Sequence, residues 1–409
     1  MKRLSIWQKA YLVQKARQGP FLRRAKKERD RRRQLAEMAL EPPAPEDDTG
    51  VHQITIYRRG KVRFGTARER RPMPANFCLV ENYEEVSQFL IELRHRLTLM
   101  GQRLENLRVE GGVRRKLDWD QRRIDSYVDF ASLTRITPSA ALVLASEYDR
   151  AISVYRAPEW LRAVNVEKWD PAVLATLKDV GFLSLLGVDS PVTNIAERNG
   201  IVTVPFLSGS KVQGASIDKL IRIMAEMADS SGIADSETLL KRSRVYDGLG
   251  EAIQNVEDHA YPVGAFRDYP VAKKWWMTGA VELGKKRFTI AIYDQGISIP
   301  VSLPRWTQYD ELRATLAKSF GGEYNPTDYP ERDGETISAA VQLGRSSTGK
   351  EYHGKGLPVI KAIIDNCAGG TVRILSRNGE YSFSGGQKPS HASHKLPIAG
   401  TLVEWEMLL

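Results

Sequence analysis

The sequence is poor in cysteine and contains no long apolar run. Its two cysteines, Cys78 and Cys367, are far apart and have no metal-ligand spacing, so we expect no disulfide framework. No stretch of roughly 18 or more uncharged apolar residues occurs, which predicts that no helix crosses a membrane. The N-terminus also lacks the continuous apolar segment of a signal peptide. Together these absences favour the reducing cytoplasm as the compartment.

Net charge singles out one part of the chain. The whole chain carries +10, and residues 1–40 hold 13 Lys and Arg against 3 Asp and Glu, so the other residues balance. Eight of the eleven residues from Arg23 to Arg33 are basic. Such a segment has little apolar surface to bury, and we expect an exposed or partner-bound helical arm. Nucleic acid bound through residues 1–40, an acidic protein surface and a solvated tail remain open as alternatives.

The length of 409 residues predicts two or three domains. Glu41 to Gly50 is rich in proline and acidic residues, which is typical of a linker. We therefore predict a basic helical arm with its linker over residues 1–48. A smaller α/β domain is expected over residues 49–204, and a second α/β domain over residues 205–409.

Hydrophobic patterning predicts most of the elements. Strands are expected over residues 51–56, 124–130, 201–206, 286–294, 371–376 and 402–407. Helices are expected over residues 84–100, 139–154, 171–180, 217–227 and 235–259, with a further one beginning near Leu357. In the strand 286–294, one face is formed by Phe288, Ile290 and Ile292. Residues 303–334 are polar, and we expect them to be irregular.

Glu251, Asn255 and His259 recur every four residues, so on a helix they lie on one face. Buried without partners, a carboxylate, an amide and an imidazole would each cost on the order of 1–3 kcal/mol or more. An amide oxygen is a suitable ligand for Mg²⁺, and a nearby glutamate can orient or deprotonate a nucleophile. For this triplet alone, a solvated polar helix face is the alternative interpretation.

Three later segments each suit one part of a nucleotide. Asp294 ends a strand and can accept a hydrogen bond from the exocyclic amine of adenine, while Gly296 lets the backbone approach the ring. The glycine-rich segment 344–356 enters a helix whose N-terminus, at Leu357, can hold phosphates. Thr401 follows Gly400 at the start of a closing strand. The candidate phosphate ligands of the glycine-rich segment are Ser346, Ser347, Gly349, Lys350, Gly354, Lys355 and Gly356.

This order of motifs resembles the ATPases of the GHKL superfamily, which unites gyrase, a heat-shock chaperone, histidine kinases and MutL. Glu251-x-x-x-Asn255-x-x-x-His259-Ala260 is similar to its N-box, in the form found in anti-sigma-factor serine kinases. Asp294-x-Gly296 is similar to the first glycine box, and Gly400-Thr401 to the final strand motif. The second glycine box is matched by His353-Gly354-Lys355-Gly356-Leu357.

The resemblance implies a C-terminal Bergerat-type α/β sandwich, with a mixed sheet covered by helices, that binds ATP and Mg²⁺. It implies Asn255 as the metal ligand, Glu251 as the general base, and Asp294 and Thr401 as contacts of adenine. For His259, a phosphate contact and a packing role both remain open. The sequence departs from the pattern at Ser298, where a second glycine is usual, and at Pro358, where a glycine often follows the second box.

Residues 105–190 resemble, more distantly, the regulatory STAS domain. In that family a strand, a loop and a helix carry a phosphorylatable serine at the start of the helix, and Ser139 would occupy that place. The loop Thr137-Pro138-Ser139-Ala140 lacks the aspartate and glycine usual in the family. An unrelated small α/β domain, with Ser139 as an ordinary residue at the start of a helix, is therefore the alternative.

Three functions fit these patterns. No histidine lies between His95 and His259, so a histidine autokinase is not expected, and because the chain ends at Leu409 we expect no further domain of the gyrase or MutL type. The favoured hypothesis is an ATPase switch whose segment 344–356 controls docking of a partner protein, or of a second copy, in a bacterial regulatory or defence-type assembly. A serine/threonine kinase of the anti-sigma-factor type and a non-catalytic ATP-sensing adaptor are the alternatives.

Overall fold

The computed structural model describes most of the chain from residue 51 to residue 408. The described ranges are 51–58, 61–110, 123–156, 161–188, 200–230, 232–233, 235–242, 244–265, 269–283, 285, 287–306, 309–320, 324–343 and 356–408. The chain divides into two compact units, Met1–His52 and Gln53–Leu409. The basic arm and linker expected over residues 1–48 lie outside the described residues.

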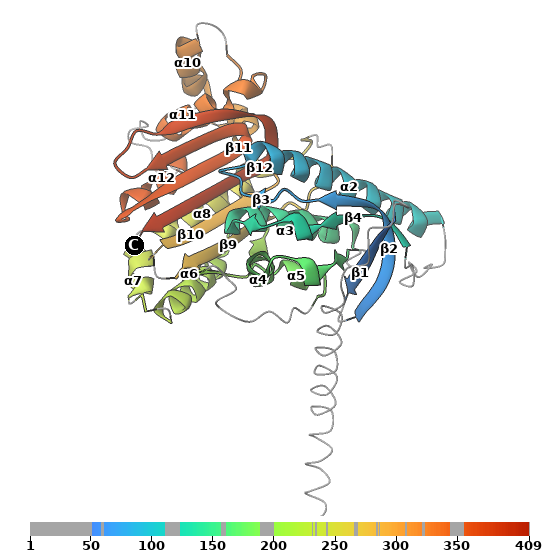
Figure 1. Ribbon diagram of the computed structural model, residues 1–409. Coiled ribbons are helices and arrows are strands. Elements are labelled where there is room, and N and C mark those ends of the chain that lie inside the picture. The colour runs from blue at the N-terminus through green and yellow to red at the C-terminus, as the bar shows by residue number, and fades with distance from the viewer. Residues whose placement is uncertain are drawn as a thin grey trace, which may run out of the picture. The chain divides into compact units, whose positions relative to one another are not determined.

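A six-stranded sheet dominates the described part of the C-terminal half (Figure 1). Its strand order is β11-β12-β10-β9-β7, and β8 pairs with β9 beside β7. Each pairing recorded between these strands is antiparallel. The strands are β7 (Ile201–Thr203), β8 (Leu207–Gly209), β9 (Trp275–Glu282), β10 (Arg287–Asp294), β11 (Gly369–Ser384) and β12 (Ser390–Leu408).

Alternate side chains of strand β10 pack into two different hydrophobic cores. Phe288, Ile290 and Ile292 pack into one hydrophobic cluster, whereas Ala291 and Tyr293 pack into another. Successive side chains of a strand point to opposite faces, so the sheet separates the two cores. The face predicted from the sequence for Phe288, Ile290 and Ile292 is thus confirmed.

Helices cover both faces of this sheet. The core that contains Phe288 is completed by residues of α6 (Gly214–Asp229), α7 (Ser236–Arg242), α8 (Val245–Asn255), α10 (Tyr309–Phe320), α11 (Asp333–Leu343) and α12 (Gly356–Asp365). The opposite core is completed by residues of α2 (Tyr83–Glu110), α3 (Pro138–Tyr155), α4 (Pro171–Asp179) and α5 (Phe182–Leu185). The N-terminal helices therefore pack directly on the back of the C-terminal sheet.

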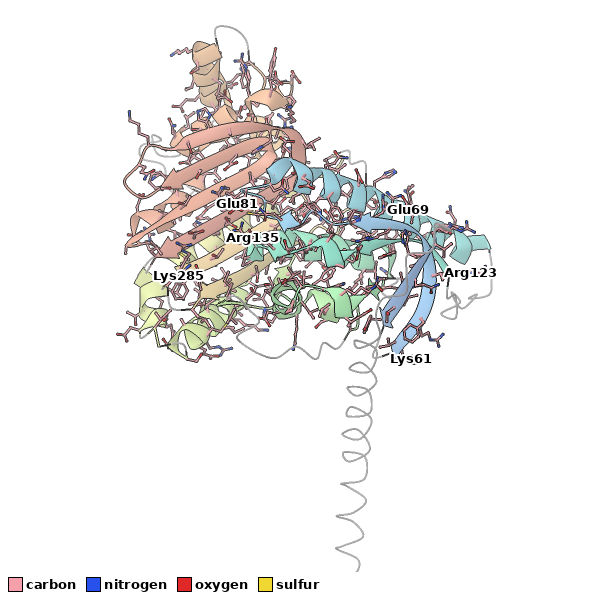
Figure 2. The ribbon with its side chains drawn as sticks, in the orientation of Figure 1. Lys61, Glu69, Glu81, Arg123, Arg135 and Lys285 are labelled. Carbon is pink, nitrogen blue, oxygen red and sulfur yellow. The ribbon has the colours of Figure 1, made fainter. Side chains whose placement is uncertain are left out.

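The N-terminal half contributes two further small sheets. The four-stranded one has the order β4-β2-β1-β6, with β2 parallel to β4 and β1 antiparallel to β6. A parallel pair joins β3 to β5, and the exposed ion pair of Glu81 with Arg135 ties β5 to the turn before α2 (Figure 2). These strands are β1 (His52–Arg58), β2 (Lys61–Pro72), β3 (Asn76–Phe77), β4 (Arg123–Asp129), β5 (Arg135–Ile136) and β6 (Ala163–Val164). An α/β fold with a mixed sheet is confirmed at this level.

Buried charges join α2 to α3 behind strand β10. The Glu147 carboxylate, fully buried on α3, accepts hydrogen bonds from Arg94 on α2 at 2.6 and 3.0 Å and from Arg150 at 3.3 Å. Arg150 also donates to the carbonyl oxygen of Pro270 at 3.1 Å. The ring of Tyr269 faces both guanidinium groups, at 4.8 and 5.2 Å from its centre. The segment between α8 and β9 is thereby held against α3.

Several boundaries differ from those predicted. The helix expected over 235–259 is divided, because Arg244 has a positive φ of 61° between α7 and α8, and a π-helical turn, Val256–Ala260, follows α8. Residues 303–334, expected to be irregular, contain α10, a 3-10 turn at Leu303–Arg305 and another at Pro330–Arg332. The closing strand, expected over residues 402–407 with Gly400-Thr401 at its start, begins at Ser390. Strand β9 was not predicted.

Ser139 lies near the start of α3, and its side chain is buried. The helix is capped by Thr137, whose Oγ1 accepts a hydrogen bond from the N–H of Ala140, and Pro138 occupies the first turn. Ser139 is 2% exposed. Burial raises the pKa of the Glu404 carboxyl on β12, and a contact with the Ser139 hydroxyl opposes this shift. In this conformation the Ser139 hydroxyl packs against the sheet, as an ordinary residue at the start of a helix does.

Candidate functional site

A pocket opens where α8 and α12 meet the C-terminal ends of β10 and the middle of β12. The space inside it measures about 550 Å³, a figure that includes the part open to solvent. Residues of α8, the π turn, β10, β12, α12 and the short helix α9 (Ile299–Ser302) line it. They are Ala252, Asn255, Val256, His259, Ala260, Ile292, Tyr293, Asp294, Ser298, Ile299, Ser302, Trp306, Leu357, Ile360, Thr401 and Val403.

Asp294 and Thr401 face the pocket together because they are direct partners in the β10–β12 ladder. Side chains that are opposite each other on antiparallel strands stand on the same face with Cβ atoms about 5 Å apart. Gly400, just before Thr401, has a φ of 69° and lies against the carbonyl oxygen of Asp294, where a Cβ would collide. This glycine therefore permits the close approach that brings the two side chains to the pocket.

Glu251 and Asn255 converge on the start of α12. A Cβ placed on Gly356 would lie 3.1 Å from Glu251 Oε2 and 3.1 Å from Asn255 Nδ2, so both side chains touch this glycine. The first N–H groups of a helix lack helical partners, and the helix dipole makes this end positive. A carboxylate, an amide and a helix N-terminus thus meet at one edge of the pocket. The helix N-terminus suits phosphate groups, and the side-chain oxygens suit the cation that accompanies them.

His259 lines the pocket from the π turn. Its ring centre lies 6.3 Å from that of Trp306, at an angle of 42°. Burial lowers the pKa of His259 below the usual range of histidine, and the neighbouring Asp258 opposes this shift. An imidazole with a lowered pKa supplies less positive charge for a phosphate, but its N–H can still donate a hydrogen bond to one. A phosphate contact and packing beside Trp306 both stay open for His259.

The turn after β10 is fixed by its own hydrogen bonds. Asp294 Oδ1 accepts from the N–H of Gly296 at 2.6 Å, and the hydroxyl oxygen of Tyr261 accepts from the N–H of Gln295 at 2.9 Å. Gly296 packs against Ala260 so closely that a Cβ would collide. Gly296 is thus required because the turn after β10 packs against the π-helical turn 256–260, whether or not its backbone also approaches a ligand.

Ser298 carries backbone strain at the edge of the pocket. Its φ of 75° and ψ of 159° lie in a region that is essentially restricted to glycine. Within the described residues, its Oγ is buried and has no hydrogen-bond partner. Position 298 is usually glycine in the family that the sequence resembles, and glycine here would relieve the backbone strain. The serine instead places a hydroxyl at the pocket wall.

We expect Ser298→Gly to raise the free energy of unfolding by about 1 kcal/mol. Relief of the strained backbone is worth about 1–3 kcal/mol, and the extra freedom of glycine in the unfolded chain removes about 0.5–1 kcal/mol of that. Urea unfolding followed by circular dichroism measures the change. The control is Ser302→Gly on α9, where φ is ordinary and a loss of stability is expected. An unchanged or lower stability of Ser298→Gly would show that the strain is not stored there.

The structure brings together seven of the residues predicted from the sequence. Asn255, His259, Asp294, Leu357 and Thr401 line the pocket, and Glu251 and Gly356 touch at its edge. Gly296 lies in the turn below Asp294. The remaining candidates, Ser346, Ser347, Gly349, Lys350, Gly354 and Lys355, lie outside the described residues. Trp306, Ser302 and Ile360 also line the pocket but were not predicted, because no sequence motif marks them. For Trp306, the available signal was a lone tryptophan in a polar segment.

Comparisons of the chain with protein-family models, with curated proteins and with solved structures find no match. Within the described ranges, no group of three or more His, Cys, Asp and Glu side chains is placed to hold a metal ion. A Mg²⁺ ion bound with a nucleotide needs only one or two protein ligands, because phosphates and water supply the rest. None of the described helices is long and apolar enough to cross a membrane.

Proposed function

We propose that the chain binds Mg²⁺-ATP in the pocket between α8, β10, β12 and α12 and hydrolyses it as a switch. The observation that carries the proposal is the convergence of Asn255, Asp294 and Thr401, from three distant segments, on one pocket beside the start of α12. Adenine would lie against Asp294 and Thr401, and the phosphates near Asn255 and Gly356. Mg²⁺ would be held by the Asn255 amide oxygen together with the phosphates, and it would neutralise their charge.

In this proposal Glu251 holds the attacking water and takes its proton. Its carboxylate lies beside Gly356 and Asn255, at the edge of the pocket assigned to the phosphates. The segment 344–356 joins α11 to α12 and would cover the phosphates, so its state would report the bound nucleotide to a partner protein. A GHKL-type fold, a cytoplasmic setting and a bacterial regulatory or defence-type assembly belong to the same proposal.

Incubation with γ-labelled ATP and Mg²⁺, with and without the products of neighbouring genes, tests the proposed hydrolysis. Release of free labelled phosphate supports the switch. Label transferred to a protein would instead establish the serine/threonine kinase, and ATP binding without either product would establish the adaptor. Retention of ATP on the chain in equilibrium dialysis distinguishes the adaptor from a chain that binds no nucleotide.

We expect Asp294→Asn to weaken ATP binding by about 10- to 100-fold. The amide oxygen of asparagine still accepts the hydrogen bond from Gly296, so the turn is kept. Its NH₂ group, however, would replace an acceptor with a donor opposite the amine of adenine, and a hydrogen bond to a charged group is worth about 1.5–3 kcal/mol. Calorimetric titration with Mg²⁺-ATP measures the change.

The matched control for Asp294→Asn is Asp247→Asn on the exposed surface of α8, whose side chain pairs with Arg244. This variant should bind ATP as the wild type does. Equal affinity of Asp294→Asn and wild type would show that Asp294 does not read the base.

A further inference from the structure

Outside residues 1–40 the charges balance in total, but they are distributed unevenly. The fifteen residues from Tyr57 to Arg71 contain seven Lys and Arg and one Glu, a net charge of +6. Five of the seven basic residues belong to β2, which lies between β1 and β4 in the four-stranded sheet. Strand β2 therefore carries an excess of positive charge that the balanced total hides.

Carboxylates nearby neutralise only part of this charge. Asp129 pairs with Arg70 at 2.6 Å, and Glu69 pairs with Arg71 at 2.5 Å. Arg68, which is exposed, forms no ion pair with another residue that the structure describes. Such an arginine on an exposed strand is available to an anionic partner.

Phe64, Thr66 and Arg68 share one face of β2. The two residues between them in the sequence are buried, whereas Phe64 and Arg68 are exposed. Successive side chains of a strand point to opposite faces, so these three stand on the solvent side. Arg123, exposed at the start of β4, is the register partner of Thr66 and stands on the same side (Figure 2). We call these four residues the β2 face.

The ring of Phe64 is the unusual feature of the β2 face. It is 62% exposed, the largest fraction among the aromatic side chains that the structure describes. Arg68 lies four residues further along the strand, about 13 Å away. Asp125 also lies on this side of β4 and offsets one of the positive charges. Stacking on Phe64 should therefore contribute more to binding than charge alone.

An exposed ring beside arginines suits a single strand of nucleic acid. An unpaired base can stack on the ring while neighbouring phosphates contact the guanidinium groups. In a duplex, both faces of each base are already covered by the bases next to it. An acidic peptide would pair with the arginines but would leave Phe64 without a stacking partner.

We propose that the β2 face binds single-stranded nucleic acid, with one base stacked on Phe64 and phosphates at Arg68 and Arg123. RNA and DNA share both recognised groups. The β2 face belongs to the four-stranded sheet, whereas the ATP pocket lies on the six-stranded sheet. The inference is therefore independent of the proposed ATP binding, and each can fail without the other.

Fluorescence anisotropy of the full chain with labelled oligo(U) or oligo(dT) of about 15 nucleotides tests the stacking. We expect Phe64→Leu to weaken binding by about 5- to 100-fold, the contribution of one stacked base, and Phe64→Tyr to bind as wild type does. The control is Leu99→Ala, which removes another exposed apolar side chain, on α2, and should change nothing. Thermal melting shows that each variant is folded. Binding of neither strand by wild type, or equal affinity of Phe64→Leu and wild type, overturns the inference.

Salt dependence tests the phosphate contacts separately. For single strands, the slope of log affinity against log salt concentration should fall by about 0.7 for each phosphate contact that is lost. We expect this fall in Arg68→Gln and again in Arg123→Gln. Arg222→Gln, on the exposed surface of α6, is the control and should keep the wild-type slope. An unchanged slope in both test variants overturns the assignment of phosphates to these arginines.

Cross-linking locates the strand on the full chain, because residues 1–40 are basic as well. An oligonucleotide that carries 5-iodouracil reacts on illumination with aromatic side chains stacked on it. We expect the label on Phe64. Label confined to residues 1–40, or tighter binding of a duplex than of the single strand, overturns the inference. Tighter binding of polyglutamate than of the single strand also overturns it and assigns the β2 face to an acidic protein.

Discussion

If the chain hydrolyses ATP as proposed, we expect Glu251→Gln to leave ATP affinity within about threefold of wild type and to lower the rate of hydrolysis by about 10²- to 10⁴-fold, the usual contribution of a positioned general base. The amide keeps the size of the carboxylate beside Gly356 and Asn255, so the edge of the pocket keeps its shape. It cannot take a proton from water, however, and turnover is therefore lost while binding remains. Phosphate release at saturating ATP and calorimetric titration measure the two quantities separately.

The control for Glu251→Gln is Glu226→Gln, which removes a carboxylate from the exposed surface of α6. Its hydrolysis rate should equal that of wild type. Unchanged hydrolysis in Glu251→Gln would remove the catalytic role of this residue. A loss of ATP affinity with unchanged turnover at saturation would assign Glu251 to binding instead.

We expect Glu147→Ala to lower the free energy of unfolding by about 3–5 kcal/mol, because it leaves two arginines without their buried partner. The side chains of Glu147 and Arg150 are fully buried, and that of Arg94 is 9% exposed. Without the carboxylate, both guanidinium groups would remain buried and uncompensated between α2, α3 and β10, the strand that carries Asp294. Urea unfolding followed by far-ultraviolet circular dichroism measures the change.

An exposed ion pair supplies the control for Glu147→Ala. Lys241 and Glu237 pair on the surface of α7, with side chains 67% and 55% exposed. Pairs of this kind contribute about 0–1 kcal/mol, so Glu237→Ala should have little effect. A change of less than about 1 kcal/mol in Glu147→Ala would mean that water or a shifted side chain replaces the carboxylate.

The residues of the candidate pocket could be predicted because local rules place them. Asp294 ends a strand with clear alternation, and Thr401 opens a segment with the same pattern. The ladder between β10 and β12 then puts them opposite each other. The four-residue spacing of Glu251 and Asn255 needs only the helix period. The four-residue spacing is local, whereas the placement of Asp294 opposite Thr401 depends on the long-range pairing of β10 with β12.

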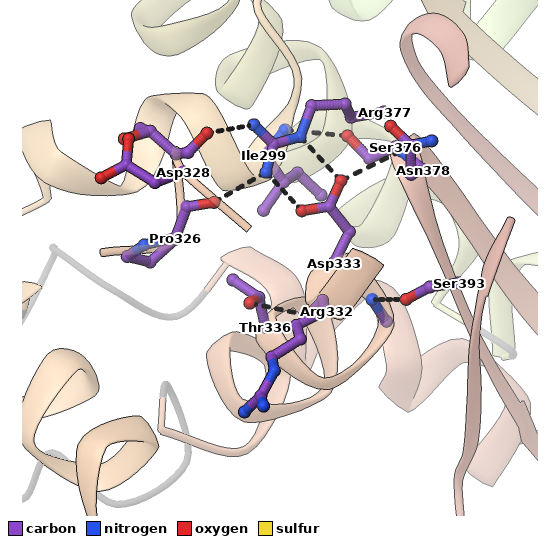
Figure 3. Close-up of polar contacts among 12 residues, drawn as sticks. Ile299, Pro326, Asp328, Arg332, Asp333, Thr336, Ser376, Arg377, Asn378 and Ser393 are labelled. Carbon is purple, nitrogen blue, oxygen red and sulfur yellow. Dashed lines mark hydrogen bonds and ion pairs between the residues drawn. The ribbon is translucent and has the colours of Figure 1, made fainter. Parts of the chain in front are cut away.

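Other features depend on tertiary context that the sequence does not display. Strand β9 is buried along nearly its whole length, from Trp275 to Val281, so it lacks the alternation of a half-exposed strand. Helix α10 is short and polar on much of its surface, and its pattern resembles that of a loop. The β-bulge at Arg377 in β11, where the guanidinium pairs with the Asp333 carboxylate (Figure 3), becomes visible only when the register of β11 against β12 is known.

Photo-crosslinking with 8-azido-ATP and Mg²⁺, followed by peptide mapping, tests whether ATP binds in the pocket between α8, β10, β12 and α12. We expect saturable labelling of the full chain that excess ATP prevents. The labelled peptides should come from residues 245–260, 287–306 and 401–408, which contain the pocket lining around Asn255, Asp294 and Thr401. Labelling that ATP does not prevent, or that is confined to other peptides such as residues 1–40, would contradict the account.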